Sequence, residues 1–313
     1  MMLSIVSTLY CSSPFINEFH SRISKVAKSV ACDDYEIILV DDGSPDNSLE
    51  IAKTLSEQDP HLVLVELSRN FGHHKAILAG MSQAQGDLVY LIDIDLEEQP
   101  EWLSDFKKEL DETGADVVYG VQRQRTGSAF NNMTSALFWK ILALTSDTKI
   151  PQNPTTCRLM KKSYVEAAIS VQDRATFLAG TFAWAGFVQH PFYVDKTARV
   201  EKKSSYIFVK KIILALNSLL SFTTTPLIAT FIGGVLISAM AMFFAFYLIL
   251  HKLLNPDYVL MGFTSLLVSI WFIAGIVIML LGVLGLYLAK IFQEVRHRPL
   301  YVVKNIYKRD CDG

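Results

Sequence analysis

The chain has 313 residues, a length that allows about two domains. Apolar residues make up 51% of it, charged residues 19%, and the mean hydropathy is +0.29, so the chain is too apolar to be disordered. Its net charge of −2 argues against a nucleic-acid-binding protein, because such proteins need a basic surface. Either the chain is one very apolar globule, or part of it lies in lipid.

Strand and helix patterns alternate along the N-terminal part of the chain. Apolar, β-branched runs predict five strands, at residues 3–9, 35–40, 62–67, 88–92 and 117–120. Helical patterns predict helices at residues 15–31, 48–58, 74–84 and 102–113. Continuous apolar strands separated by helices indicate an α/β fold, with a mostly parallel sheet that is covered on both faces. We expect residues 1–200 to form this domain.

Polar side chains follow these strands where each strand ends. They are Asp41 and Asp42 after the second strand, Arg69 after the third, Asp93 and Asp95 after the fourth, and Arg123 and Arg125 after the fifth. Ligands of such sheets bind outside the carboxyl ends of the strands. Two carboxylates two residues apart can bind Mg²⁺ together with substrate phosphates. Because these polar residues all follow strand ends, the sequence predicts a binding site there. Each motif alone also fits an ordinary turn or helix cap.

Two common nucleotide-binding classes are disfavoured. No G-x-G-x-x-G follows the first strand, as a dehydrogenase would require, and no G-x-x-x-x-G-K-[ST] of a P-loop NTPase occurs. After Gly72 come His73, His74 and Lys75, which fit either a diphosphate-binding loop or ordinary exposed polar residues.

Two uncharged apolar runs lie near the C-terminus, at residues 227–250 and 259–289. Each exceeds the roughly 20 residues that cross a bilayer core as a helix. The segment between them contains Asn255-Pro256-Asp257, which is typical of a turn. The pattern predicts a two-helix transmembrane hairpin over residues 226–290, in preference to two buried helices of a soluble core.

Basic residues flank this hairpin on both sides. Residues 196–211 hold six Lys or Arg, residues 290–313 hold six, and the loop between the spans holds only Lys252. The bias predicts that residues 1–200 and the tail 291–313 are both cytosolic. Within residues 201–225, residues 206–222 place their polar side chains on one arc when they are arranged as a helix. This segment is predicted to be an amphipathic helix in the membrane interface, with a helix packed on the soluble domain as the alternative.

The motifs together carry a family resemblance that covers nearly the whole chain. They are, in order, YEIILVDDGSPDNS, LSRNFGHHKAILAG, GDLVYLIDIDLEEQPE, VVYGVQRQR, FAWAGF, TTTPL and EVRHRPLYVV. This set resembles the family 2 glycosyltransferases that act on polyprenyl phosphate, which include bactoprenol glucosyltransferases, lipid A aminoarabinose transferases and dolichol-phosphate mannose synthases. The resemblance implies a Rossmann-like GT-A fold, a nucleotide-sugar donor (a UDP-sugar is favoured), Mg²⁺ or Mn²⁺, and undecaprenyl phosphate as acceptor. It also implies a homo-oligomer, tetrameric in some members.

The same resemblance implies roles for individual residues. The donor nucleotide would contact Tyr10, Asp41, Asp42, Arg69 and Asp93. The metal would bind Asp95 and Glu97, where the family usually has Gln at the second position. The acceptor phosphate would contact Arg123 and Arg125, and nearer the membrane Arg199, Lys203, Ser204 and Tyr206. Asp93, Asp95, Arg123, Arg125 and Arg158 form the expected catalytic set.

The chain also departs from the family pattern. The family's Tyr-Asn-Glu after the first strand is Tyr10-Cys11-Ser12, and Thr156 replaces an Asp that is often assigned a catalytic role. A phosphate monoester is largely dianionic at pH 7 and is already a nucleophile, so a strong general base is not essential. We therefore expect one inverting transfer on the cytosolic face of a bacterial inner membrane, for cell-envelope glycans such as lipopolysaccharide O-antigen.

Parts of the sequence also bear on two other functions. The Thr156 replacement also fits an inactive membrane-tethered protein that binds a nucleotide-sugar or acts as a scaffold. A processive polysaccharide synthase is disfavoured, because the chain has no Q-x-x-R-W motif. The sequence leaves the sugar open.

Overall fold

The computed structural model describes residues 1–123, 154–171, 178–195, 225–254 and 262–309. The chain divides into two compact units. The first holds a sheet with its helices and includes the C-terminal segment Arg298–Gly313. The second holds two long helices within Lys211–His297.

The first unit is built on an eight-stranded sheet with the order β7-β5-β6-β4-β1-β2-β3-β8. The strands are β1 (Leu3–Leu9), β2 (Tyr35–Asp41), β3 (Leu62–Leu67), β4 (Leu88–Leu91), β5 (Val117–Gln122), β6 (Pro154–Lys161), β7 (Gln189–Val194) and β8 (Val303–Lys308). Strands β4, β1, β2 and β3 are mutually parallel neighbours, whereas β6 and β8 run antiparallel to the strands beside them. The predicted α/β fold with a mostly parallel sheet is confirmed.

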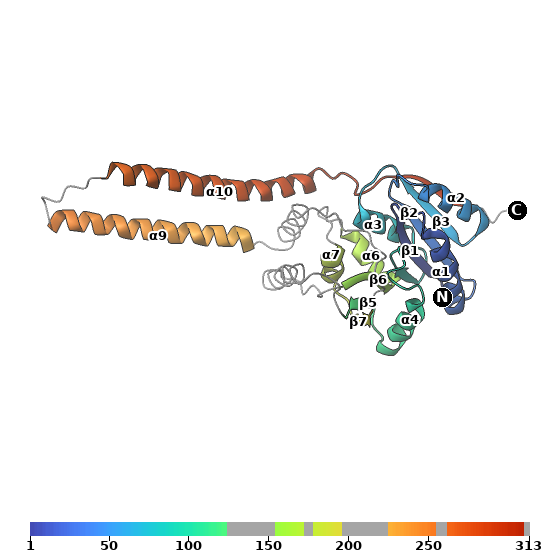
Figure 1. Ribbon diagram of the computed structural model, residues 1–313. Coiled ribbons are helices and arrows are strands. Elements are labelled where there is room, and N and C mark those ends of the chain that lie inside the picture. Colours follow the sequence, from blue (N-terminus) through green and yellow to red (C-terminus); the bar gives the residue numbers. More distant parts are fainter. Residues whose placement is uncertain (124–153, 172–177, 196–224, 255–261, 310–313) are drawn as a thin grey trace. The chain divides into compact units, whose positions relative to one another are not determined.

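Helices cover both faces of this sheet (Figure 1). One face packs against α1 (Ile16–Ala31), α2 (Ser48–Gln58) and α4 (Trp102–Thr113); the other packs against α3 (His73–Gln83), α6 (Lys162–Ser170) and α7 (Leu178–Trp184). Alternate residues of β2 supply the two cores, since Ile37 and Leu39 belong to the first and Ile38 and Val40 to the second. A strand buried on both faces needs apolar side chains at every position, which is why a continuous apolar run in the sequence located it.

Three strands, β6, β7 and β8, lie outside the five predicted ones, and two of these, β7 and β8, are edge strands. β8 has the sequence VKNIYK and is mostly exposed, and β7 is half-buried. Both lie at the edges of the sheet, where one side of the strand faces away from the core. Such strands need no continuous apolar run, so the pattern that reveals central strands is absent from them.

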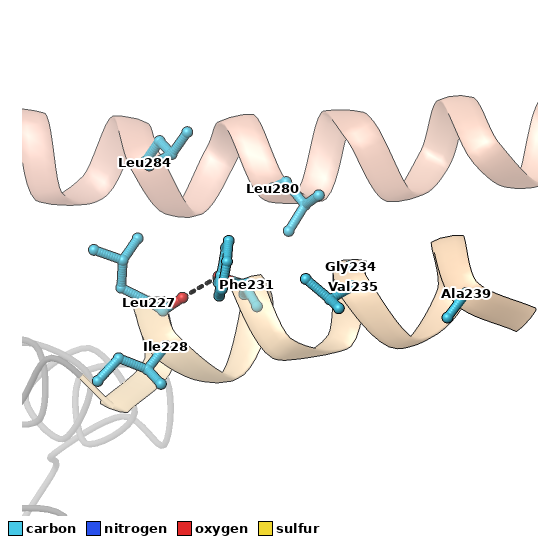
Figure 2. A pocket seen from close by; sticks show the side chains of 9 residues that line it. Leu227, Ile228, Phe231, Gly234, Val235, Ala239, Leu280 and Leu284 are labelled. Atoms are coloured by element: carbon cyan, nitrogen blue, oxygen red, sulfur yellow. Dashed lines mark hydrogen bonds between the residues drawn. The ribbon is translucent and has the colours of Figure 1, made fainter.

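The second unit contains α9 (Thr225–Leu254) and α10 (Phe263–Val295). Among the described residues, one helical stretch, Phe272–Ala289 in α10, is long and apolar enough to cross a membrane. Its mean hydropathy is 2.6, and none of it is buried within the protein. Leu227 and Phe231 of α9 line an apolar pocket together with Leu280 and Leu284 of α10 (Figure 2). The predicted interfacial helix at 206–222 lies outside the described residues.

Candidate active site

The carboxyl ends of four parallel strands meet at one edge of the sheet, because β4, β1, β2 and β3 are neighbours. This edge brings together most of the residues expected to bind the donor and the metal: Tyr10, Asp41, Asp42, Arg69, Asp93 and Asp95. Tyr10 is more than half exposed there. The arrangement has the geometry that ligand sites of open α/β sheets use.

Asp41, the last residue of β2, is almost completely buried. Its Oδ2 accepts the Ser44 backbone N–H at 3.3 Å, whereas its Oδ1 has no hydrogen-bond partner among the described residues. Burial raises the pKa of this carboxyl to about 6; backbone N–H groups of Ser44 and Gly43 oppose the shift, and the charge of Glu66 adds to it. A buried oxygen without a partner can receive a donor group from a ligand.

Asp42 is equally buried, but both of its oxygens are occupied. Oδ1 accepts the N–H of Phe71 at 2.7 Å and Oδ2 accepts the N–H of Gly72 at 2.9 Å. Burial raises the pKa of Asp42, and these two hydrogen bonds work against the rise. The residue that the resemblance assigned to the nucleotide therefore also anchors the segment between β3 and α3.

We call residues 68–72 the donor loop, since they carry Arg69. Gly43 lies against this loop with φ of +63°, and a Cβ at Gly43 would lie 2.6 Å from the backbone nitrogen of Asn70. Only glycine allows both this conformation and this approach. Arg69 is exposed, and its guanidinium lies 4.2 Å from the centre of the Phe71 ring.

A hydrogen-bonded cluster around Asp46 was missed by the sequence analysis. Its carboxylate accepts the hydroxyls of Ser44 and Ser48, each at 2.6 Å, and the Ser13 N–H at 3.1 Å. Burial opposes ionisation, but these hydrogen bonds outweigh it and hold the pKa of Asp46 well below its ordinary value. Ser44 also accepts the Cys11 N–H at 2.8 Å. The cluster joins the segments after β1 and β2, and the Ser- and Asp-rich run 44–48 was the available signal.

The segment after β4 carries the expected metal ligands. Asp93, Asp95 and Glu97 are all partly exposed, and the Glu97 N–H donates to Asp95 Oδ1 at 3.2 Å. Among the described residues, no three His, Cys, Asp or Glu side chains group closely enough to hold a metal by themselves. Mg²⁺ commonly uses one or two carboxylates and completes its shell with substrate phosphates and water. The carboxylates of Asp95 and Glu97 fit that mode of binding.

Glu98 is a further residue that the sequence did not single out. It is completely buried, and its carboxylate accepts two backbone N–H groups: Asp93 at 3.3 Å and Thr156 at 3.1 Å. It thereby ties the segment that carries Asp93 and Asp95 to the start of β6. Thr156 thus lies beside the segment that carries the expected metal ligands, on the strand that pairs with β4.

Replacing Glu98 by alanine is expected to lower the free energy of unfolding by about 2–4 kcal/mol, because two backbone N–H groups lose their acceptor. Urea titration of the detergent-solubilised protein measures this. Glu57→Ala, at an exposed position of α2, is the matched control and should change stability little. Equal stability of the Glu98 variant and the control would contradict the assignment.

His73 begins α3 and bridges two strand ends. Its Nδ1 lies 3.0 Å from Thr8 Oγ1, and its Nε2 lies 3.5 Å from Asp93 Oδ1. Loss of water around the ring lowers its pKa to about 4; the neighbouring His74 also lowers it, and Asp95 acts in the opposite direction. The lowered pKa disfavours the protonated form of His73.

Two arginines of the expected catalytic set lie in contrasting places. Arg123 is exposed after β5, and its backbone N–H donates to Val194 at 3.2 Å. Arg158 is buried in β6. Its guanidinium lies 3.7 Å from the centre of the Phe182 ring and donates to the carbonyls of Thr155 and Thr156, each at 3.3 Å. Burial lowers the pKa of Arg158.

The contacts of Arg158 are those of a residue that supports β6, because its guanidinium donates to protein carbonyls in the interior. The remaining residues expected at the acceptor site are Arg125, Arg199, Lys203, Ser204 and Tyr206, and they lie outside the described residues.

Comparison with known proteins identifies the family. Residues 4–168 match the family described as Glycosyl transferase family 2. A protein of Mycobacterium tuberculosis described among "Putative glycosyltransferases" is 38% identical, over 99% of this chain and 90% of that protein. The undecaprenyl-phosphate 4-deoxy-4-formamido-L-arabinose transferase of Shewanella sediminis is 32% identical, over 97% of this chain and 92% of its own.

The bactoprenol glucosyl transferase of Shigella phage SfV is 31% identical, over 97% of this chain and 99% of its own length. These similarities extend through the apolar C-terminal helices as well as the sheet. The chain belongs to glycosyltransferase family 2, and it is a glycosyltransferase related to the bactoprenol glucosyl transferases and the undecaprenyl-phosphate aminoarabinose transferases.

Proposed function

We propose that the protein transfers one sugar from a nucleotide-sugar, favoured to be a UDP-sugar, to polyprenyl phosphate. The observation that carries this proposal is full-length similarity to two enzymes whose names give undecaprenyl phosphate or bactoprenol as the acceptor. The site supports it, since a carboxylate-rich strand edge suits a nucleotide diphosphate with a cation. The apolar lining of the pocket between α9 and α10 suits an isoprenoid chain.

At the donor end, the unpartnered oxygen of Asp41 would accept a hydrogen bond from the nucleoside, and Arg69 would face the phosphates. Asp95 and Glu97 would hold Mg²⁺ or Mn²⁺ together with the diphosphate. When bound, the cation would neutralise negative charge on the leaving diphosphate. Asp93, held by Glu98 through its backbone, would lie beside the ribose and phosphates.

At the acceptor end, a phosphate oxygen attacks the anomeric carbon while the bond from that carbon to the diphosphate breaks, so the configuration inverts. Two like unit charges about 4 Å apart repel by about 4 kcal/mol at an effective dielectric constant near 20. Arg123 and Arg125 would offset this repulsion. The dianionic acceptor needs no strong general base, which accommodates Thr156.

For the membrane part, we propose that α9 and α10 form a transmembrane hairpin with both flanks in the cytosol of a bacterial inner membrane. Support comes from the unburied apolar stretch Phe272–Ala289 and from the basic residues on both flanks. Residues 201–225 would lie in the interface, with Arg199, Lys203, Ser204 and Tyr206 close to the acceptor headgroup. A homo-oligomer is expected on the family resemblance alone.

The direct test incubates purified protein with Mg²⁺ or Mn²⁺, undecaprenyl phosphate and each of a panel of radiolabelled UDP-sugars. A lipid-linked product, identified by mass spectrometry, is the expected result and names the sugar. Nucleotide-sugar binding by calorimetry without any lipid product would instead support the inactive scaffold.

Replacing Arg123 by alanine is expected to raise the KM for polyprenyl phosphate by about 10- to 100-fold, the equivalent of one lost charge-assisted hydrogen bond. The donor KM should stay unchanged, because Arg123 follows β5 and not the strands of the donor site. Steady-state kinetics with each substrate varied in turn measures both. Lys108→Ala, an exposed cation on α4, is the control; an unchanged acceptor KM in the Arg123 variant would refute the role.

A further inference from the structure

The C-terminal strand β8 pairs with β3 directly beside the donor loop. The antiparallel register runs from Val63 opposite Lys308 to Leu67 opposite Val303. The pairing continues past the end of β3, since the Ser68 N–H donates to the Val302 carbonyl at 2.9 Å. The first residue of the donor loop is therefore bonded to the segment that follows α10 in the sequence.

A buried carboxylate, Glu66 of β3, holds β8 in this place. Glu66 is 4% exposed and contacts three side chains of β8. Lys304 forms an ion pair with Oε1, Asn305 Nδ2 donates to Oε2 at 2.9 Å, and Tyr307 Oη donates to Oε2 at 2.7 Å. Burial opposes ionisation of Glu66, but these donors outweigh it and lower its pKa to about 2.

Polar contacts matter here because β8 buries little apolar surface. Ile306 is 49% exposed, and no residue of the strand is fully buried. Burial of apolar area contributes only about 25 cal/mol per Å², so a strand this exposed gains little from it. The Glu66 cluster and the ladder of backbone hydrogen bonds hold β8 on the sheet, together with Val303 and Tyr307, which are partly buried against the two cores.

The donor loop is thus fixed at both of its ends. Val302 holds its first residue, and Asp42 accepts the N–H groups of its last two residues, Phe71 and Gly72. Arg69 lies between these anchors. If β8 were released, the Asp42 anchor would remain but the start of the loop would lose its partner.

We propose that β8 is a positioning element for donor binding: Glu66, through Lys304 and Tyr307, fixes the C-terminal strand, and the strand fixes the start of the donor loop that presents Arg69. That the loop binds a nucleotide-sugar donor rests on the function proposed above. The coupling between β8 and the loop rests on their contacts alone. The residues after the last apolar helix would thereby help to set nucleotide-sugar affinity.

The test compares the full-length double variant Lys304→Ala/Tyr307→Phe with Lys308→Ala, an exposed control on the same strand. Hydrogen exchange should accelerate at least about 10-fold at residues 62–72 and 302–308 in the double variant, and stay unchanged in α1, because the released backbone groups exchange through local opening. The donor KM should rise about 5- to 10-fold, with kcat and the acceptor KM unchanged, as expected for lost binding common to ground and transition states. Lys304→Arg should retain the wild-type donor KM.

Two results would overturn the inference. One is unchanged exchange at 302–308 in the double variant, since the cluster would then not hold β8. The other is faster exchange at 302–308 without any change at 68–72 or in the donor KM. Failure of the wild-type protein to glycosylate any lipid would defeat the proposed function instead, and the exchange measurements would still decide whether β8 orders the loop.

Discussion

Replacing Asp95 by alanine is expected to lower the rate of sugar transfer by about 10²–10³-fold or more, the range found when one group that stabilises transition-state charge is removed. Asp95 is the carboxylate proposed to share a cation with the donor diphosphate, and Glu97 alone would offer a weaker site. Chelation of divalent cations should have the same effect on the wild-type protein. The rate of product formation at saturating donor and acceptor measures the effect of the substitution and the effect of chelation.

Asp105→Asn is the matched control for this experiment, since Asp105 is an exposed carboxylate on the neighbouring helix α4. It should retain wild-type activity. The Asp95 variant should unfold at the same urea concentration as the wild type, because Asp95 is partly exposed. Full activity of the Asp95 variant would remove this residue from the proposed metal site.

Replacing Asp41 by asparagine is expected to stabilise the donor-free protein at neutral pH while it weakens donor binding. The pKa of Asp41 is about 6 in the folded chain and 3.8 in a free carboxyl. Below the lower value both states are protonated, and folding carries no penalty. As pH rises towards 6, the unfolded state loses its proton first, so stability falls, and above 6 the loss is constant at about 3 kcal/mol. Asparagine stays neutral and avoids this loss.

Urea unfolding at pH 4.0 and pH 7.5, without nucleotide, measures the effect. The stability difference between the Asp41→Asn variant and the wild type should be small at pH 4.0 and reach up to about 3 kcal/mol at pH 7.5. Asp46→Asn should show the opposite sign at pH 7.5, because the pKa of Asp46 is held below its ordinary value and its charge stabilises the fold. A pH-independent difference for the Asp41 variant would contradict the burial argument.

The carboxylates at the strand ends were located by the sequence, but their contacts were not. Asp41 ends a strand that is buried along its whole length, and Asp93 follows another such strand, so apolar runs alone located both carboxylates at strand ends. What each carboxylate does there could not be predicted in the same way. Asp41 keeps an oxygen without a partner, whereas the adjacent Asp42 gives both oxygens to the donor loop.

The contacts that sequence reasoning did not find share a physical cause. Glu98 bonds to Thr156, and Glu66 bonds to Tyr307 near the other end of the chain. Arg158 is stacked on Phe182 inside the protein, a contact between β6 and α7. Each pairing depends on which strands become neighbours, and a strand order that is not sequential leaves no local trace.

The sequence by itself determined the fold class, the family and the edge of the sheet that carries the carboxylates, because these depend on periodicity and motifs within short segments. It also separated an apolar C-terminal region from the α/β part. Only the tertiary structure decided that the segment after α10 returns to the sheet as β8, and that buried carboxylates at Glu66 and Glu98 hold the site's loops. A buried charge is stable only where several donors converge on it, and those donors come together only when distant segments fold against one another.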